Sequence, residues 1–127
     1  MKNLLIVDDD PLTLKGLSEN LKFYDEDFNI STASNGEEAI EIIESAQVDL
    51  LITDLNMPVK SGYELIAYIS KQHPGTPVII LTASDCEAAC KMLPRFDPCN
   101  CINKPINLEL LLELIYSMLD NGSKIKS

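Results

Sequence analysis

Short apolar runs alternate with longer amphipathic segments along the whole chain. The runs NLLIV (3–7), DLLIT (49–53) and VIILT (78–82) are continuous, which is typical of strands covered on both faces. FNISTA (28–33) alternates between apolar and polar residues as a strand does, and CNCIN (99–103) fits a brief fifth strand. The pattern therefore predicts five strands.

The segments between these runs have the spacing of amphipathic helices. In the first of them, Pro11 opens the helix, and Leu14, Leu17 and Leu21 fall on one stripe. The predicted helices cover residues 11–24, 37–46, 63–73, 85–93 and 108–119. Because parallel strands are joined by crossover helices, this alternation predicts an α/β fold, with five helices covering both faces of a parallel sheet.

The chain has room for a single core. A length of 127 residues suits one ordinary domain and is too short for two. We expect that domain to cover residues 1–120. Residues 121–127 are polar and are expected to form a flexible tail or the start of a linker.

The formal net charge of −10 narrows the set of partners. Such a charge repels phosphate backbones, so direct binding to nucleic acid is not expected. No apolar run is long enough to span a bilayer, so we expect no membrane association and a cytoplasmic location.

Four cysteines, Cys86, Cys90, Cys99 and Cys101, lie close together in the sequence. In the cytoplasm we expect them to be reduced thiols. Their spacing differs from that of the common zinc sites, so small buried apolar residues are the preferred interpretation, with zinc binding as the alternative. A redox role is a further alternative that nothing in the sequence supports.

Polar residues with complementary chemistry follow the predicted strands. Asp8 and Asp9 end the first strand, Asp54 the third and Thr82 the fourth, and Lys104 follows the fifth. The carboxyl ends of parallel strands share one edge of a sheet, where ligands bind. Carboxylates gathered there indicate a site for Mg²⁺, or alternatively Mn²⁺. An aspartate in such a site can act as a nucleophile and accept a phosphoryl group.

Four motifs in this order give the chain a family resemblance. LLIVDDDP, LLITDLNMPVKSG, VIILTAS and INKPIN together resemble the receiver domains of two-component response regulators, over roughly residues 2 to 120. The resemblance implies a flavodoxin-like, doubly wound fold with strand order 2-1-3-4-5. It also implies that the chain is a phosphoacceptor domain that assists its own phosphorylation and dephosphorylation, and is not an enzyme in the usual sense.

The resemblance also assigns roles to the residues at the strand ends. It makes Asp54 the phosphoacceptor, Thr82 the switch hydroxyl and Lys104 the partner of the phosphoryl group. For the metal, it implies that Asp9 and Asp54 bind directly, that Asp8 helps through water, and that Asn56 contributes its backbone carbonyl.

Pro105 and Asp10, which lie next to residues of this site in the sequence, are expected to have structural roles. Pro105 would follow a cis peptide bond, as in the family. Asp10 has no assigned ligand role, and its place before Pro11 indicates a helix cap.

The resemblance supplies partners that the composition does not. The phosphoryl donor would be a histidine kinase or a histidine phosphotransfer protein. The last helix carries apolar residues around much of its circumference, which indicates a homodimer face or a docking face for an effector domain.

The position three residues before the lysine is usually aromatic in the family, and here it is Cys101. A small thiol repacks little surface when it moves. We therefore expect phosphorylation to rearrange residues 84–91 more than the fifth strand.

Three rival functions remain at this point. A receiver-like scaffold that is never phosphorylated would keep the same fold. A phosphatase with an aspartate nucleophile could use Asp8 and Asp10, but its motif requires threonine where this chain has Leu12. A flavodoxin-like FMN binder needs a phosphate-binding loop after the first strand, where three aspartates would repel the ligand.

Overall fold

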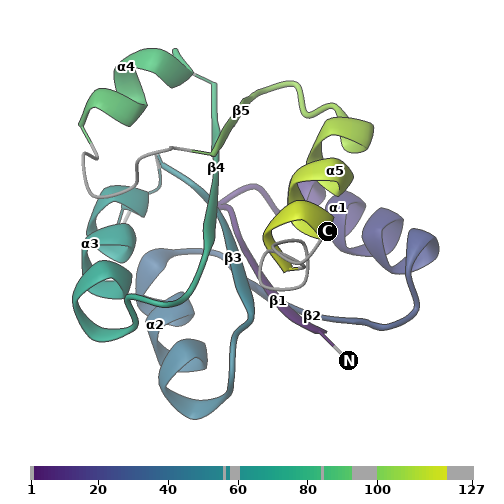
Figure 1. Ribbon diagram of the computed structural model, residues 1–127, viewed down its shortest axis with the longest axis horizontal. Helices are drawn as coiled ribbons and strands as arrows, with labels where there is room; N and C mark the ends of the chain where they lie inside the picture. The colour runs from purple at the N-terminus through teal and green to yellow at the C-terminus, as the bar shows by residue number, and fades with distance from the viewer. Residues whose placement is uncertain (1, 56, 58–60, 84, 93–99, 120–127) are drawn as a thin grey trace, which may run out of the picture.

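The computed structural model describes residues 2–55, 57, 61–83, 85–92 and 100–119. Its centre is a five-stranded parallel sheet with the order β2-β1-β3-β4-β5 (Figure 1). The strands are β1 (Lys2–Val7), β2 (Phe28–Ala33), β3 (Leu50–Asp54), β4 (Val78–Thr82) and β5 (Cys101–Asn103). The predicted fold class and strand order are confirmed.

Five helices cover the two faces of this sheet (Figure 1). One face carries α2 (Gly36–Ser45), α3 (Gly62–Gln72) and α4 (Cys86–Lys91), and the other carries α1 (Pro11–Tyr24) and α5 (Leu108–Leu119). None of these helices is long and apolar enough to cross a membrane, within the part of the chain that the structure describes. The predicted tail, residues 121–127, lies outside that part.

The strands at the centre of the sheet are buried because helices cover both faces. Every residue of β3 and β4 is buried. Side chains alternate along each strand, so Leu51 faces the core beneath α2 and α3 while Ile52 faces the core beneath α1 and α5. Continuous apolar runs are therefore required here, as the sequence indicated.

The helices begin at residues whose side chains cap them. The Asp10 carboxylate accepts hydrogen bonds from the Leu12 N–H at 3.1 Å and from the Thr13 hydroxyl at 2.9 Å, which confirms its predicted role as a cap. These bonds, the one from Thr13 first, lower the pKa of Asp10. Ser61 and Glu64 form a reciprocal capping box at the start of α3.

The last strand and the helix before it are shorter than predicted. The helix expected over 85–93 is Cys86–Lys91, and the strand expected over 99–103 is Cys101–Asn103. Asp85 caps the helix rather than joining it. Ala89 is the buried residue of α4 and Ile102 that of β5, so both elements contribute little to the core.

The prediction that the cysteines are reduced thiols is wrong for Cys86, Cys90 and Cys101, which are all disulfide-bonded. Cys86 and Cys101 form a disulfide, with their Cα atoms 5.8 Å apart. The start of α4 lies beside β5, and that separation is normal for a disulfide. The expected cellular compartment does not reveal such a bond, because the pairing depends on which cysteines the fold brings together. A four-cysteine zinc site is excluded in this state.

Candidate functional site

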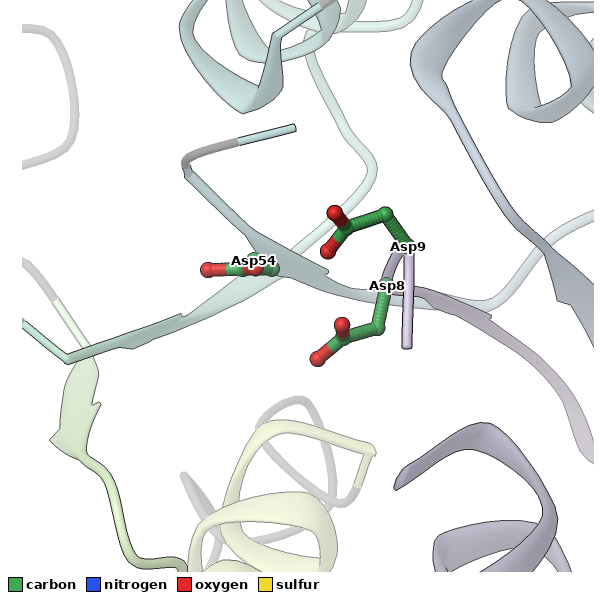
Figure 2. Close-up of side chains that lie close together, drawn as sticks. All are labelled: Asp8, Asp9 and Asp54. Carbon is green, nitrogen blue, oxygen red and sulfur yellow. The ribbon is translucent and has the colours of Figure 1, made fainter. Parts of the chain in front are cut away.

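Three carboxylates gather at the carboxyl edge of the sheet. Asp8 and Asp9 follow β1, Asp54 ends β3, and Figure 2 shows the three side chains close together at this edge. Each offers one oxygen atom, and these oxygens lie within 4.8 Å of each other. The parallel pairing of β1 with β3 produces this arrangement. Val7 lies opposite Thr53, and each of these residues is followed directly by an aspartate.

Lys104 brings a positive charge to the same point from the segment after β5. Its Nζ atom lies 2.9 Å from Asp8 Oδ2 and 3.4 Å from Asp54 Oδ2. Partial burial lowers the pKa of Lys104, but the hydrogen bond to Asp8 and the charges of Asp54 and Asp8 outweigh it, so the net pKa shift is upward. The lysine therefore stays charged and offsets part of the carboxylate repulsion.

The three aspartates differ in exposure and in hydrogen bonding. Asp8 is 0% exposed; its Oδ1 accepts from the Asp10 N–H at 2.9 Å, and its Oδ2 accepts from Lys104. Asp54 is 5% exposed, and Asp9 is exposed. Because both oxygens of Asp8 already have partners, this arrangement favours Asp9 over Asp8 as a direct metal ligand, as the resemblance implies.

Thr82 lies next to the lysine at the end of β4. The residue is 0% exposed, and its backbone carbonyl accepts a hydrogen bond from the Lys104 N–H at 2.8 Å. The peptide bond between Lys104 and Pro105 is cis, as the resemblance implies. Asn56, the remaining predicted metal ligand, lies outside the described residues, so its role stays a prediction.

Gly62 supports Asp54 in a way that sequence reasoning missed. Its N–H donates to the Leu55 carbonyl at 2.9 Å, which brings the start of α3 against the end of β3. A Cβ atom at this position would lie 2.6 Å from the Leu55 Cα atom and closer still to the Asp54 carbonyl oxygen. The only signal was the glycine in LLITDLNMPVKSG, which nothing local explains.

The donor set suits a hard divalent cation. Asp8, Asp9 and Asp54 carry three negative charges against the single positive charge of Lys104, and all their donor atoms are oxygens. Oxygen ligands with excess negative charge favour Mg²⁺ or Mn²⁺ over softer metals. Asp9 and Asp54 would be direct ligands, and the ion would neutralise charge and orient a phosphoryl oxygen next to Asp54.

Comparisons with known proteins agree with this geometry. Residues 4–116 match the family described as the response regulator receiver domain. The chain is 35% identical over 121 residues to the transcriptional regulatory protein GlrR of Escherichia coli, covering 95% of this chain and 27% of that protein. It is 36% identical over 118 residues to a cyclic di-GMP phosphodiesterase of Thermotoga maritima, covering 93% of this chain and 31% of that protein. The chain thus spans about a third or less of these relatives.

Solved structures share the fold over nearly the whole chain. A CheY-like receiver domain protein from Methanospirillum hungatei has a TM-score of 0.85 and 31% identity, with 98% of each chain covered. The response regulator TrrA of Thermotoga maritima, in complex with Mg²⁺ and beryllium fluoride, has a TM-score of 0.79 and 33% identity, with 93% of this chain and 99% of that chain covered.

Proposed function

The chain belongs to the family of response regulator receiver domains, and from that premise we propose that Asp54 is its phosphoacceptor. The observation that carries this proposal is the position of the Asp54 carboxylate, beside Asp8 and Asp9 and 3.4 Å from the Lys104 ammonium. A phosphoryl group arriving at Asp54 would meet this positive charge, which can bind one of its oxygens.

The proposed reaction is a transfer between two side chains. An oxygen of Asp54 attacks the phosphorus atom of a phosphohistidine, the new P–O bond forms as the P–N bond breaks, and the imidazole leaves with the bonding electron pair. Lys104 holds one phosphoryl oxygen and the Thr82 hydroxyl another. The gain comes from positioning and charge neutralisation, so few residues are needed.

The phosphatase alternative, with Asp8 as nucleophile, fits less well. Asp8 is 0% exposed and both of its oxygens accept hydrogen bonds, whereas Asp54 is 5% exposed and ends β3 beside Asp9, the other proposed metal ligand. A scaffold that is never phosphorylated has the same fold, and only the acceptor chemistry separates it from a working receiver domain.

Intact-mass measurement after incubation with acetyl phosphate and Mg²⁺ tests the proposal. We expect one phosphoryl group on the wild-type chain, none on Asp54→Asn, and an undiminished amount on Asp10→Asn. Asp10 is the matched control because it belongs to the same run of three aspartates, and asparagine also caps helices well. Labelling that persists in Asp54→Asn, or its absence from the wild type, would reject Asp54. Replacing Mg²⁺ by Mn²⁺ tests whether either ion suffices.

The partners remain part of the proposal. We infer a histidine kinase or histidine phosphotransfer protein as the donor and a cytoplasmic location, because receiver domains take their phosphoryl groups from such proteins. In a longer protein, the domain would regulate an attached effector. Transfer from a purified, autophosphorylated kinase, compared between the wild type and Asp54→Asn, tests the donor.

A partner surface on α5 has less apolar area available than its sequence suggested. Leu111 and Ile115 are buried, and most of the other apolar side chains pack against the same core. Leu110 and Tyr116 expose 43% and 39% of their surface, and the Tyr116 hydroxyl also donates to Asp25 at 3.0 Å. A homodimer or an attached effector would use this smaller surface. Sedimentation with and without beryllium fluoride tests for the dimer, and a monomer in both states would exclude it.

A further inference from the structure

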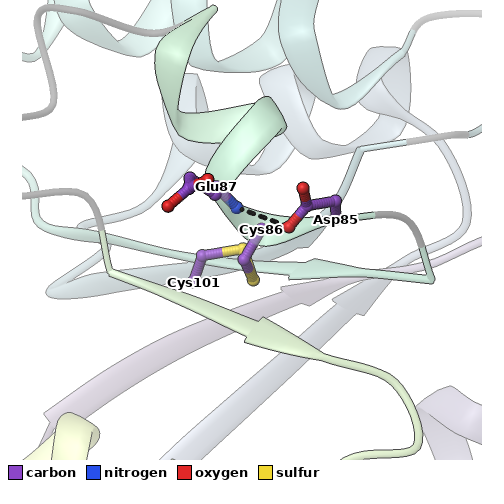
Figure 3. Close-up of a disulfide and its surroundings, with 4 residues drawn as sticks. All are labelled: Asp85, Cys86, Glu87 and Cys101. Carbon is purple, nitrogen blue, oxygen red and sulfur yellow. Dashed lines mark hydrogen bonds between the residues drawn. A yellow bond between two sulfur atoms is a disulfide. The ribbon is translucent and has the colours of Figure 1, made fainter.

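The disulfide between Cys86 and Cys101 joins two elements that lie next to the proposed phosphorylation site. Cys86 is the first residue of α4 and Cys101 the first residue of β5, and the bond closes a separation of 15 residues (Figure 3). Both residues are half-buried. Because β5 is the end strand of the sheet, the bond lies at the sheet edge, within reach of a small reductant.

The two cysteines are close in sequence to the two residues proposed to bind the phosphoryl group. Cys86 lies four residues after Thr82, and Cys101 lies three residues before Lys104. The strands that carry these residues are paired, with Thr82 opposite Asn103 and Ile80 opposite Cys101. A displacement of the segment after Thr82 is therefore transmitted to Cys86, which the disulfide holds against β5.

Few buried side chains fix α4 in the described part of the chain, although Cys90 on this helix is also disulfide-bonded. The helix has six residues, of which Ala89 is buried, and β5 has three residues, of which Ile102 is buried. A helix this short is not stable by itself and depends on its contacts. The Cys86–Cys101 disulfide is accordingly the covalent link that joins α4 directly to β5.

We propose that the Cys86–Cys101 disulfide is a redox-modification site that controls how far phosphorylation at Asp54 moves α4. This inference rests on the proposed function. In the oxidised chain the bond raises the free energy of any state in which the two elements separate, so α4 and β5 respond as one unit. In the reduced chain α4 moves independently of β5, which would allow phosphorylation to rearrange residues 84–91 more than the fifth strand.

The chemistry requires a dithiol reductant. One thiolate of the dithiol attacks a sulfur of the Cys86–Cys101 bond, and its second thiolate then displaces the protein from the mixed disulfide. Two electrons and two protons pass to the protein, which gains two thiols, while the dithiol becomes a disulfide. A low-molecular-weight disulfide reverses the reaction. Disulfides in cytosolic proteins are commonly of this transient type.

The expected effect on ligand binding follows from the same restraint. A ligand that prefers the rearranged state binds with an apparent affinity reduced by the fraction of molecules in that state. Beryllium fluoride with Mg²⁺ is the probe for the phosphorylated state. We expect it to bind the dithiol-treated chain about fivefold more tightly than the oxidised chain, the lower end of usual coupling between sites.

The test compares the full chain in its oxidised and dithiol-treated forms, each with and without Mg²⁺ and beryllium fluoride. Non-reducing peptide mapping identifies the joined cysteines, circular dichroism checks the fold, and hydrogen exchange follows residues 85–92. We expect the disulfide to be reduced without loss of the fold. In the reduced form, beryllium fluoride should change the hydrogen exchange of residues 85–92 more and should bind more tightly. Equal responses in both forms would overturn the proposal, as would unfolding on reduction, which would make the bond a structural staple.

Variants assign the effect to this pair of cysteines. Cys86→Ser and Cys101→Ser should each show the larger response before any dithiol is added. Cys90→Ser is the matched control on the same helix: it removes the disulfide of Cys90 but leaves the Cys86–Cys101 bond intact, so it should keep the redox response. A response lost in Cys90→Ser but kept in Cys86→Ser would overturn the assignment.

Asp54→Asn separates this inference from the proposed function. In this variant we expect no response to beryllium fluoride, while reduction alone still raises the exchange of residues 85–92. If the wild type ignores beryllium fluoride in both redox states, the proposed function fails. If the wild type responds equally in both states, only the redox inference fails.

Discussion

The carboxylate site at the ends of β1 and β3 and the edge formed by α4 and β5 are held in place by different means. The site lies on strands that are buried on both faces, and its charged groups are positioned without any covalent link. The α4–β5 edge contributes two buried residues and is joined by a disulfide. Where packing is extensive, the fold positions functional groups by itself. Where the elements are too short to bury much surface, a covalent bond supplies the restraint.

Gly62→Ala is expected to have the largest effect on stability, and it tests whether packing holds the carboxylate site in place. The added Cβ would meet backbone atoms of Asp54 and Leu55, which cannot rotate away, so we expect a loss of about 3 kcal/mol, at the upper end for overpacking. Urea denaturation measures it. Gly16→Ala is the control: nothing lies within 4 Å of a Cβ there, and alanine should stabilise α1 by about 0.5–1 kcal/mol. Equal stability of the two variants would contradict the packing argument.

Reduction of the Cys86–Cys101 disulfide tests whether this bond holds the α4–β5 edge in place. A bond that closes 15 residues contributes about 3 kcal/mol by chain entropy, and measured values often fall below that figure. We expect the urea midpoint of the wild type to fall on treatment with a dithiol, and that of Cys86→Ser to fall less, because this variant keeps only the disulfide of Cys90. A midpoint that does not change in the wild type would show that noncovalent packing already holds the edge.

Lys104→Gln would sharpen the account of the carboxylate site. Removing the ammonium leaves Asp8 and Asp54 without their positive partner, at a cost of about 2 kcal/mol. Because Mg²⁺ offsets the same charges, it should stabilise this variant more than the wild type in thermal unfolding. Lys71→Gln, at an exposed position in the last turn of α3, is the control. It should change neither the stability nor the stabilisation by Mg²⁺. An identical Mg²⁺ effect in the wild type and Lys104→Gln would contradict this electrostatic account.

Tyr68→Phe has the smallest expected effect, below about 1 kcal/mol for an interaction near the surface. The Tyr68 hydroxyl donates to Glu44 at 2.6 Å and so links α3 to α2 by a noncovalent bond at the surface. This hydrogen bond raises the pKa of Tyr68 above the usual value of 10.0. The stabilisation is therefore complete below pH 10 and is lost as the pH rises through the raised pKa.

The free energy of unfolding of Tyr68→Phe and of the wild type, measured between neutral pH and pH 11, tests whether this stabilisation is lost at high pH. The difference should shrink at the alkaline end. Tyr24→Phe is the control, since Tyr24 is 58% exposed, and it should follow the wild type throughout. A Tyr68→Phe difference that grows with pH would contradict the assignment.

The central strands show how much of the fold could be predicted. The bounds of β2, β4, α1 and α5 agree with the sequence pattern, and the others differ by a few residues at their ends. Periodicity sufficed because burial on one or both faces dictates which positions are apolar. The resemblance added the strand order and the cis peptide bond at Pro105, which local patterns do not encode.

The sequence predicted which residues form the candidate site but not which of their atoms are in contact. Asp8, Asp9, Asp54 and Lys104 were expected at one edge, and they lie there. That Lys104 lies nearer to Asp8 than to Asp54 depends on side-chain positions, which no pattern in the sequence specifies. The role of Gly62 depends on the same kind of detail, namely how closely α3 approaches β3.

The sequence by itself determined the alternation of strands and helices, the capping role of Asp10 and the residues that meet at the carboxyl edge, because these follow from periodicity, local hydrogen bonding and the direction of parallel strands. Only the tertiary structure decided that Cys86 and Cys101 are bonded. Their pairing depends on the distance between the start of α4 and the start of β5, which are separated by 15 residues. Such distances are set by how elements pack, and packing involves the whole chain at once.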